Sequence, residues 1–270
     1  FIAIEGDTHD GHTFAPEVVA LGGRGVVVRE GRISDTTLAI FQDRQVVCIT
    51  VPDTTRALGD IAAYHRRRMP ARIVALTGSN GKTTTRAMTA AILNHKGSTL
   101  ATQGNLNNEI GLPLTLLQLT EAHTLAVVEM GMNHPGEIDR MARMAAPDIG
   151  MIINVAPAHL EGLHTIEGVR RAKGELLAHI APDGRAILNG DDEHCRQLAA
   201  SCPVETLLFS FDPAAPVNAT DLVAGARGWS FRLKVPSGSI PVALNVPGKF
   251  MVANALAAAA AACCCGMTPE

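Results

Sequence analysis

With 270 residues, 47% of them hydrophobic and 18% charged, the sequence has the composition of a globular protein of one large or two modest domains. Its net charge of −3 and aromatic content of 3% argue against a basic face for a nucleic-acid backbone and against an aromatic surface for stacking bases. The longest apolar run, residues 255–265, is too short to cross a bilayer, so we expect no membrane insertion.

The first segment shows strand patterns at residues 1–4, 25–30 and 45–51. A helix is expected next, capped by Asp53 or Thr54 and closed by Pro70. We place a domain boundary near residues 69–70. The sequence thus predicts a partial, smaller α/β domain over 1–69 and a second domain over 70–270.

After Pro70 the pattern alternates between apolar strands and amphipathic helices. Strands are expected at 72–76, 98–102, 124–131, 148–155, 185–190 and 205–211, and helices at 83–97, 112–119, 136–147, 166–180 and 191–200. This alternation predicts an α/β domain with a mostly parallel sheet and helices on both faces. Residues 213–247 instead predict a small antiparallel element, and 254–265 a final helix.

The six cysteines are expected to be free thiols. They form no C-x-x-C pair, so we expect no zinc site. The run 263–265 resembles small apolar helix residues of a protein in a reducing cytosol. The N-terminus shows no signal-peptide pattern and opens within a strand without Met, so we expect a cytoplasmic protein whose start is missing.

The stretch "ALTGSNGKTTT" at 75–85 joins an expected strand to an expected helix. Gly78 and Gly81 allow a tight turn whose N–H groups, with the helix N-terminus, can bind an anion. Lys82 can reach phosphate oxygens and Thr83 can bind Mg²⁺. The motif lacks its usual first glycine, so an ordinary turn with a solvated lysine is the alternative.

Two further strands bring polar residues to the same edge of the sheet. Glu129 ends a buried strand and is a candidate metal carboxylate, although a structural ion pair is the alternative. His159 and Glu161 follow the next strand, and by itself His159 is as compatible with a structural role as with a ligand. Asp148 precedes its strand and is expected at the opposite edge.

Two groups of residues are ambiguous on local grounds. Lys173 lies beside Arg170 and Arg171, and this favours a solvated cationic helix face. The side chains of Asn105, Asn107 and Asn108 can bind a polar substrate or support turns, and turns are favoured.

Five segments, in this order and spacing, resemble the Mur ligases of peptidoglycan synthesis: "TGSNGKTTT", "GNLNNEIGLPLTLL", "EMGMNHPGEI", "AHLEG" and "AKGEL". The segments "GDTHDGHTF" and "DTTRALG" resemble the family's N-terminal domain and its junction with the central one. The likeness covers nearly the whole chain and implies a UDP-muramyl-binding domain over 1–69 and an ATP-binding domain over 70–270. The family's C-terminal domain is expected to be absent from this chain, which alone should therefore be inactive.

The resemblance also implies roles for individual residues. Lys82, Glu129, His159 and Lys173 would be catalytic. The nucleotide would be bound by Gly78, Ser79, Asn80, Gly81, Lys82, Thr83, Thr84 and Asn254, with Asn254 near the adenine. Asn105, Asn107 and Asn108 would face the muramyl substrate. Thr83, Glu129, His159 and, if carbamylated, Lys173 would bind Mg²⁺. The chain departs from the family pattern at Phe250 and Met251, where His and Asn are usual.

The implied reaction is ATP-dependent amide formation through an acyl phosphate. The loop "GNLNNEIG" resembles the branch that joins D-alanyl-D-alanine to UDP-N-acetylmuramoyl-tripeptide, and we expect a monomer with these two partners and no nucleic acid. Two alternatives remain open. One is a Mur-type ligase for another amino acid or a folate, and the other is a non-catalytic nucleotide- or muramyl-binding remnant.

Overall fold

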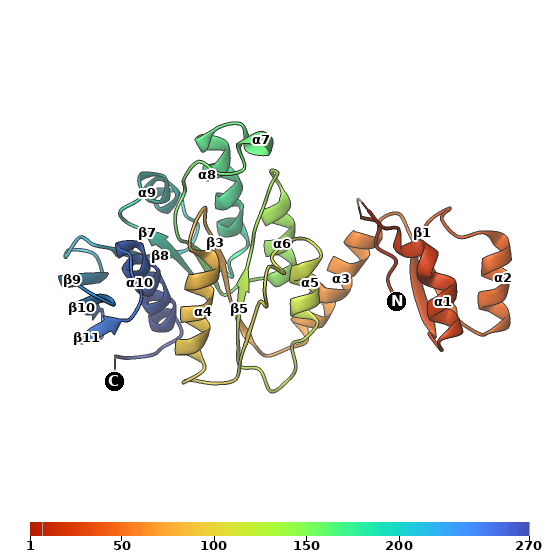
Figure 1. Cartoon of the computed structure of the whole chain (residues 1–270), viewed down its shortest axis with the longest axis horizontal. Coiled ribbons are helices and arrows are strands. Elements are labelled where there is room, and N and C mark those ends of the chain that lie inside the picture. The colour runs from red at the N-terminus through yellow and green to blue at the C-terminus, as the bar shows by residue number, and fades with distance from the viewer. Residues whose placement is uncertain (7, 270) are drawn as a thin grey trace. The chain divides into compact units, whose positions relative to one another are not determined.

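The computed structural model describes residues 1–6 and 8–269 (Figure 1). The chain divides into two compact units, residues 1–64 and 65–270. Helix α3 (Thr54–Arg67) runs from one unit into the other. It begins at Asp53, whose carboxylate accepts hydrogen bonds from the backbone N–H groups of Thr55 and Arg56 at 2.9 and 3.0 Å. Asp53 is therefore the cap of this helix.

The first unit is built on two parallel strands, β1 (Gly25–Arg29) and β2 (Val47–Val51). Helices η1 (Gly11–Phe14), α1 (Ala15–Ala20) and α2 (Asp35–Asp43) accompany them. A small core includes Val26, Val28 and Phe41. The strand expected at residues 1–4 is reduced to a single bridge between Ile2 and Val27.

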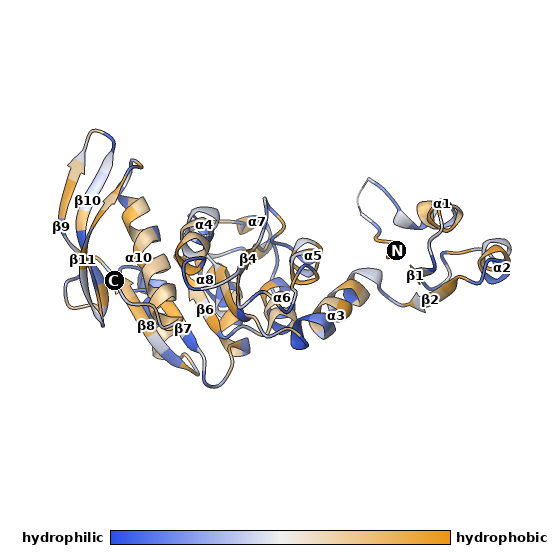
Figure 2. Ribbon diagram, turned by 90° about the horizontal axis from the view of Figure 1, so that it is seen from below, coloured by the Kyte–Doolittle hydropathy of each residue, from blue (hydrophilic) through white to orange (hydrophobic). Residues whose placement is uncertain are grey.

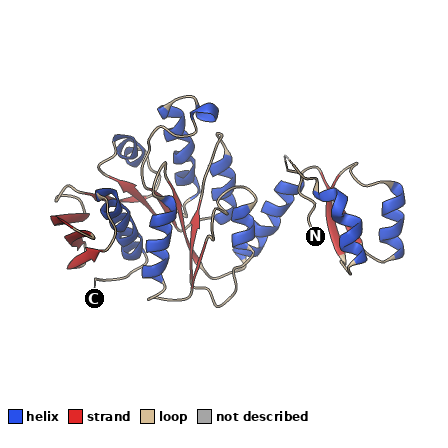
Figure 3. Ribbon diagram, viewed as in Figure 1, coloured by secondary structure: helices blue, strands red, loops and turns tan. Residues whose placement is uncertain are grey.

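The second unit is a mixed sheet of nine strands in the order β11-β10-β9-β8-β7-β6-β3-β5-β4. Helices cover both faces of this sheet (Figure 3). Its strands are β3 (Arg72–Thr77), β4 (Thr99–Ala101), β5 (Leu125–Glu129), β6 (Ile149–Ile152), β7 (Arg185–Asn189), β8 (Glu205–Ser210), β9 (Val217–Gly225), β10 (Gly228–Val235) and β11 (Gly238–Leu244). Its helices are α4 (Lys82–Leu93), α5 (Gly111–Leu116), α6 (Glu137–Ala145), α7 (Leu160–Leu163), α8 (Ile166–Gly174), η2 (Glu175–His179), α9 (Glu193–Ala200) and α10 (Lys249–Cys264).

The second unit also differs in detail from the sequence-based expectations. The antiparallel strands β9 to β11 are not a separate element, because β9 pairs in parallel with β8 and so extends the main sheet. The helix expected over 166–180 ends at Gly174 and continues as the 3₁₀-helix η2. The carboxylate of Glu175, the first residue of η2, accepts hydrogen bonds from the backbone of Gly136 and Asp139 at the start of α6.

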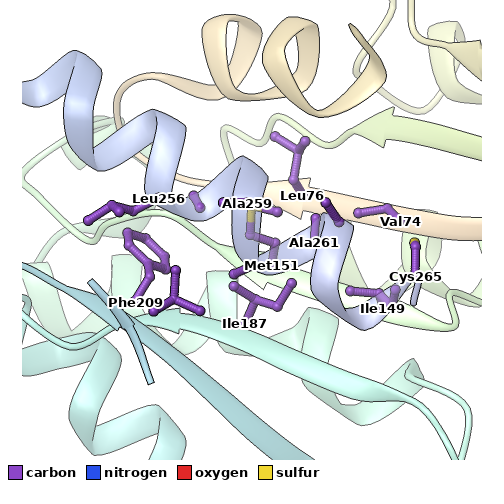
Figure 4. Packing of buried hydrophobic residues seen from close by; sticks show 14 of the residues in the cluster. Val74, Leu76, Ile149, Met151, Ile187, Phe209, Leu256, Ala259, Ala261 and Cys265 are labelled. Atoms are coloured by element: carbon purple, nitrogen blue, oxygen red, sulfur yellow. The ribbon is translucent and has the colours of Figure 1, made fainter. Parts of the chain in front are cut away.

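Helix α10 packs against the sheet and against α4. It is apolar along most of its length (Figure 2), as expected for a helix that is buried nearly all round. Its alanines let it approach closely, and Leu256 and Ala259 lie with Phe209, Ile187 and Met151 in the main core (Figure 4). Among the described residues, no helix is long and apolar enough to span a membrane.

Candidate active site

The loop between β3 and α4 has the geometry of an anion-binding turn. Gly81 adopts φ +81°, a left-handed conformation that favours glycine. No side chain caps α4, so the N–H groups of its first turn point toward the loop without a side-chain partner. A Cβ atom at Gly81 would lie 2.6 Å from Oδ1 of Asn254, so Asn254 closes one side of the loop. Such a helix start favours a bound phosphate.

The segment after β6 clamps this loop from the neighbouring strand. The Ser79 hydroxyl donates to the carbonyl of Ala156 at 2.8 Å and accepts from the N–H of Ala156 at 2.9 Å. Asn154 binds the backbone of Asn80 in both directions, at 2.9 Å each. Sequence reasoning missed Asn154, because the strand expected over 148–155 included it, whereas β6 ends at Ile152. The side chain of Ser79 and the N–H of Asn80 are thus engaged in shaping the loop.

Lys82 lies across the same loop. Its ammonium donates to the carbonyl of Gly78 at 2.9 Å. Burial lowers the pKa of Lys82, and the negative charge of Glu129 opposes that shift. A partly desolvated ammonium at a helix start is suited to bind phosphate oxygens.

Glu129 is the centre of a buried polar cluster at the end of β5. Its carboxylate accepts from the Thr83 hydroxyl at 3.2 Å and from the amide of Asn107 at 2.8 Å. A guanidinium nitrogen of Arg86 lies 3.6 Å away, and only 1% of Glu129 is exposed. The Thr102 hydroxyl also accepts a hydrogen bond from the N–H of Glu129 at 3.0 Å. Sequence reasoning missed Arg86 and Thr102, since neither residue belongs to a recognisable spacing.

The pair of Thr83 and Glu129 fits a hard divalent cation. Both offer oxygen atoms, the ligand type that Mg²⁺ prefers, and Mg²⁺ sites often use one or two carboxylates with substrate phosphates. Among the described residues, no group of three or more His, Cys, Asp or Glu side chains could hold a metal ion. A cation here would therefore need ligands from the nucleotide or water as well.

Lys173 is buried and is not part of a solvated cationic face. It is 2% exposed, whereas Arg171 is exposed and Arg170 pairs with Glu167. Burial, and then the positive charge of Lys82, lowers the pKa of Lys173 to about 7. At neutral pH a large fraction of this amine is uncharged.

His159 adopts a left-handed conformation with φ +54° at the start of α7. Burial, and then the positive charges of Lys173 and Lys82, lower its pKa, while Glu137 opposes the shift. His159 therefore feels the positive charges of both lysines. A lowered pKa keeps the imidazole neutral, which is the form that binds metals.

The three asparagines of the loop after β4 have different settings. The Asn107 amide binds Glu129, as described above. Asn108 accepts hydrogen bonds from the N–H groups of Ile110 and Gly111 and so supports the start of α5. Asn105 is exposed. Of the two expected roles, turn support therefore occurs at Asn108, while the Asn107 amide binds a buried carboxylate of the protein itself.

The start of α10 is less polar than the loop. Asn254 is buried, and its amide donates weakly to the sulfur of Met251 at 3.8 Å. The Phe250 side chain is exposed, and Lys249 lies over the ring of Phe211 at 4.4 Å.

A family model described as the Mur ligase middle domain matches residues 76–262. The UDP-N-acetylmuramoyl-tripeptide–D-alanyl-D-alanine ligase of Escherichia coli (strain K12) is 40% identical over 99% of this chain, and that of Haemophilus influenzae is 36% identical over 99%. The chain spans only 58% and 57% of these relatives' lengths.

Solved structures agree with these matches. MurF from Acinetobacter baumannii aligns with a TM-score of 0.90 and 36% identity, over 100% of this chain and 57% of that one. MurF ligase from Thermotoga maritima, solved in complex with ADP, aligns with a TM-score of 0.88 and 26% identity, over 100% of this chain and 61% of that one.

Proposed function

The chain belongs to the Mur ligase family, and we propose that it is the nucleotide- and muramyl-binding part of an ATP-dependent ligase. This enzyme would join D-alanyl-D-alanine to UDP-N-acetylmuramoyl-tripeptide in cell-wall synthesis. The observation that carries the proposal is the buried cluster in which Thr83, at the phosphate loop, meets Glu129 from the next strand. The names of the relatives and the ADP complex of a structural neighbour support the choice of substrates and nucleotide.

In the proposed reaction the terminal carboxylate of the tripeptide attacks the γ-phosphorus of ATP. An acyl phosphate forms and ADP leaves. The amine of D-alanyl-D-alanine then attacks the acyl carbon, phosphate leaves, and the amine loses a proton. This route uses the binding of charged phosphates more than covalent chemistry by the protein.

The chain's residues would act mainly by positioning and by charge. The N–H groups of Gly81 and of the first turn of α4 would bind the phosphates, in a loop that Ser79 and Asn80 hold in shape, and Lys82 would exchange its bond to Gly78 for phosphate oxygens. Thr83 and Glu129 would hold Mg²⁺, which would neutralise phosphate charge when bound. Asn254 would support the loop beside Gly81, near the adenine.

We also propose that Lys173 is carbamylated. Its uncharged amine can attack CO₂ and lose a proton, giving a carbamate anion. An anion would be stabilised by Lys82 and could hold a second Mg²⁺ together with His159, whereas an ammonium could not. A carbamate resonance after addition of ¹³C-bicarbonate, present in this chain and absent from Lys173→Met, is the expected result.

Calorimetric titration of the chain with Mg-ADP tests nucleotide binding. Lys82→Met should weaken it by about tenfold or more, because a charge-assisted phosphate contact is lost. Lys96→Met, beyond the far end of α4, is the matched control. Equal binding by Lys82→Met and the parent chain would contradict the assignment.

Turnover is a separate test, made with the complete enzyme. Release of phosphate should require both UDP-N-acetylmuramoyl-tripeptide and D-alanyl-D-alanine. A panel of other amino acids and dipeptides in place of D-alanyl-D-alanine tests specificity. Nucleotide binding without turnover on any of these substrates would favour a non-catalytic remnant instead.

A further inference from the structure

Arg86 connects two parts of the site that come from different elements. It lies one turn after Lys82 on α4, and its side chain is 12% exposed. Its Nη1 atom donates to the carbonyl of Gly104 at 3.0 Å and lies 3.6 Å from Oε2 of Glu129. One guanidinium nitrogen thus contacts both the loop after β4 and the carboxylate at the end of β5.

The loop is attached to Glu129 at a second point through Asn107. The Asn107 side-chain amide donates to Oε1 of Glu129 at 2.8 Å, and the backbone carbonyl of Asn107 accepts from the N–H of Gly131 at 2.7 Å. At the other end of this short segment, Gly104 is exposed and has φ +55°, and a Cβ atom there would meet no atom within 4 Å. The bond from Arg86 is therefore what attaches the Gly104 end to α4.

The ion pair between Arg86 and Glu129 is largely shielded from solvent. Only 12% and 2% of the two side chains are exposed, so salt and water screen their attraction weakly. Arginine stays charged at any pH at which the protein is folded. A divalent cation that binds Thr83 and Glu129 must share the carboxylate with this guanidinium and is repelled by it.

We propose that Arg86 is a positioning residue that restrains the loop 103–108 and, through Glu129, weakens cation binding at Thr83 and Glu129. The consequence for catalysis rests on the proposed function, in which this loop faces the muramyl substrate. In that setting, Arg86 couples cation occupancy to the placement of the substrate loop. Coupling between two such sites is typically of the order of 5- to 150-fold in affinity.

The first test measures the affinity of the nucleotide-free chain for Mn²⁺ by electron paramagnetic resonance. Arg86→Met keeps most of the side-chain volume and removes the charge, so it should bind Mn²⁺ about fivefold or more tightly than the parent. Arg86→Lys keeps the charge and should stay within about twofold. Glu129→Gln should abolish the signal of bound Mn²⁺, which would show that the cation binds at Glu129. Arg143→Met removes a charge from an exposed pair on α6 and is the matched control.

The second test measures hydrogen exchange of the amides in 103–108. Exchange should be about tenfold faster in Arg86→Met and closer to the parent rate in Arg86→Lys, because loss of the bond to Gly104 frees that end of the loop. Arg86→Gln is a second uncharged variant should Arg86→Met fold poorly. Unchanged Mn²⁺ affinity or unchanged exchange in the uncharged variants overturns the proposal, as does identical behaviour of Arg86→Lys and Arg86→Met.

Neither measurement depends on ligase turnover. If both effects occur and the complete enzyme shows no ligase activity, the proposed function fails and the coupling by Arg86 stands. If turnover is found and neither effect occurs, the proposed function stands and the coupling by Arg86 fails.

Discussion

The hydroxyl of Thr83 and the carboxylate of Glu129 lie 3.2 Å apart, although 46 residues separate them in the chain. Strands β3 and β5 are neighbours with Leu76 paired to Glu129, and α4 begins shortly after β3. The carboxyl ends of parallel strands meet at one edge of the sheet, where ligands of α/β folds bind. This register brings a hydroxyl and a carboxylate together at the loop that we propose binds phosphate.

Glu129→Gln should separate metal-dependent from metal-independent nucleotide binding. Glutamine has nearly the same shape but no charge, so the affinity for ADP in the presence of Mg²⁺ should fall by about tenfold or more. Affinity in EDTA should not fall, because an anionic side chain near the phosphates has been removed. Calorimetric titration with and without Mg²⁺ measures both. Glu121→Gln, in an exposed turn, is the control, and an equal loss in EDTA would argue against a metal role.

Gly81→Ala should destabilise the chain more than Gly104→Ala does. Both glycines have a positive φ, of +81° and +55°, so each substitution carries a backbone cost of about 1 to 2 kcal/mol. Only at Gly81 would the new Cβ also meet Asn254, at 2.6 Å from Oδ1. Urea unfolding measures the difference.

A double variant isolates the contact with Asn254. Adding Asn254→Ala to Gly81→Ala should restore the stability that was lost through the contact with Asn254, but not the stability that was lost through the backbone conformation. Equal stabilities of Gly81→Ala and Gly104→Ala would show that the loop moves away from α10 without cost.

Much of this fold could be predicted from residue patterns alone. The buried strands β3, β5 and β6 are continuous apolar runs, and the alternation with helices indicated a mostly parallel sheet. Local patterns failed where the outcome depended on distant partners. The alternating strands β9 to β11 gave no sign that β9 would pair with β8 and so join the main sheet.

Prediction of the site was also limited to what local patterns reveal. The positions of Glu129 and Thr83 followed from the ends of β5 and the phosphate loop. Lys173 looked solvated because its sequence neighbours are arginines, and its burial depends on helix packing that no local spacing reveals. The same holds for Arg86, whose partners Gly104 and Glu129 belong to other elements.

The buried amine of Lys173 should make stability depend on pH. Its pKa is lowered from 10.5 to about 7, so between these values the folded state holds fewer protons than the unfolded state. Stability therefore rises with pH from about 7 to about 10.5. The parent chain should have a lower free energy of unfolding than Lys173→Met, and the difference should be largest below pH 7, at most roughly 5 kcal/mol. Toward pH 10.5 this difference should vanish, apart from a constant contribution from packing.

Urea unfolding in CO₂-depleted buffer, without nucleotide, measures this dependence. Restoring bicarbonate at pH 8 should stabilise the parent chain and leave Lys173→Met unchanged, since a carbamate replaces the mostly uncharged amine with an anion that the positive charge of Lys82 stabilises. A pH-independent difference between parent and variant would mean that the amine is solvated.

Restoring the His and Asn that the family resemblance implies at the start of α10 should strengthen nucleotide binding. Phe250 is 64% exposed and its ring lies beside Gly248, so Phe250→His should change stability little. Met251→Asn would replace the weak sulfur partner of Asn254 with an amide oxygen. One added hydrogen bond to the nucleotide corresponds to about a three- to tenfold gain in affinity. Titration with Mg-ADP measures each single variant and the double variant, and unchanged affinity in all three would mean that the nucleotide does not use these two positions.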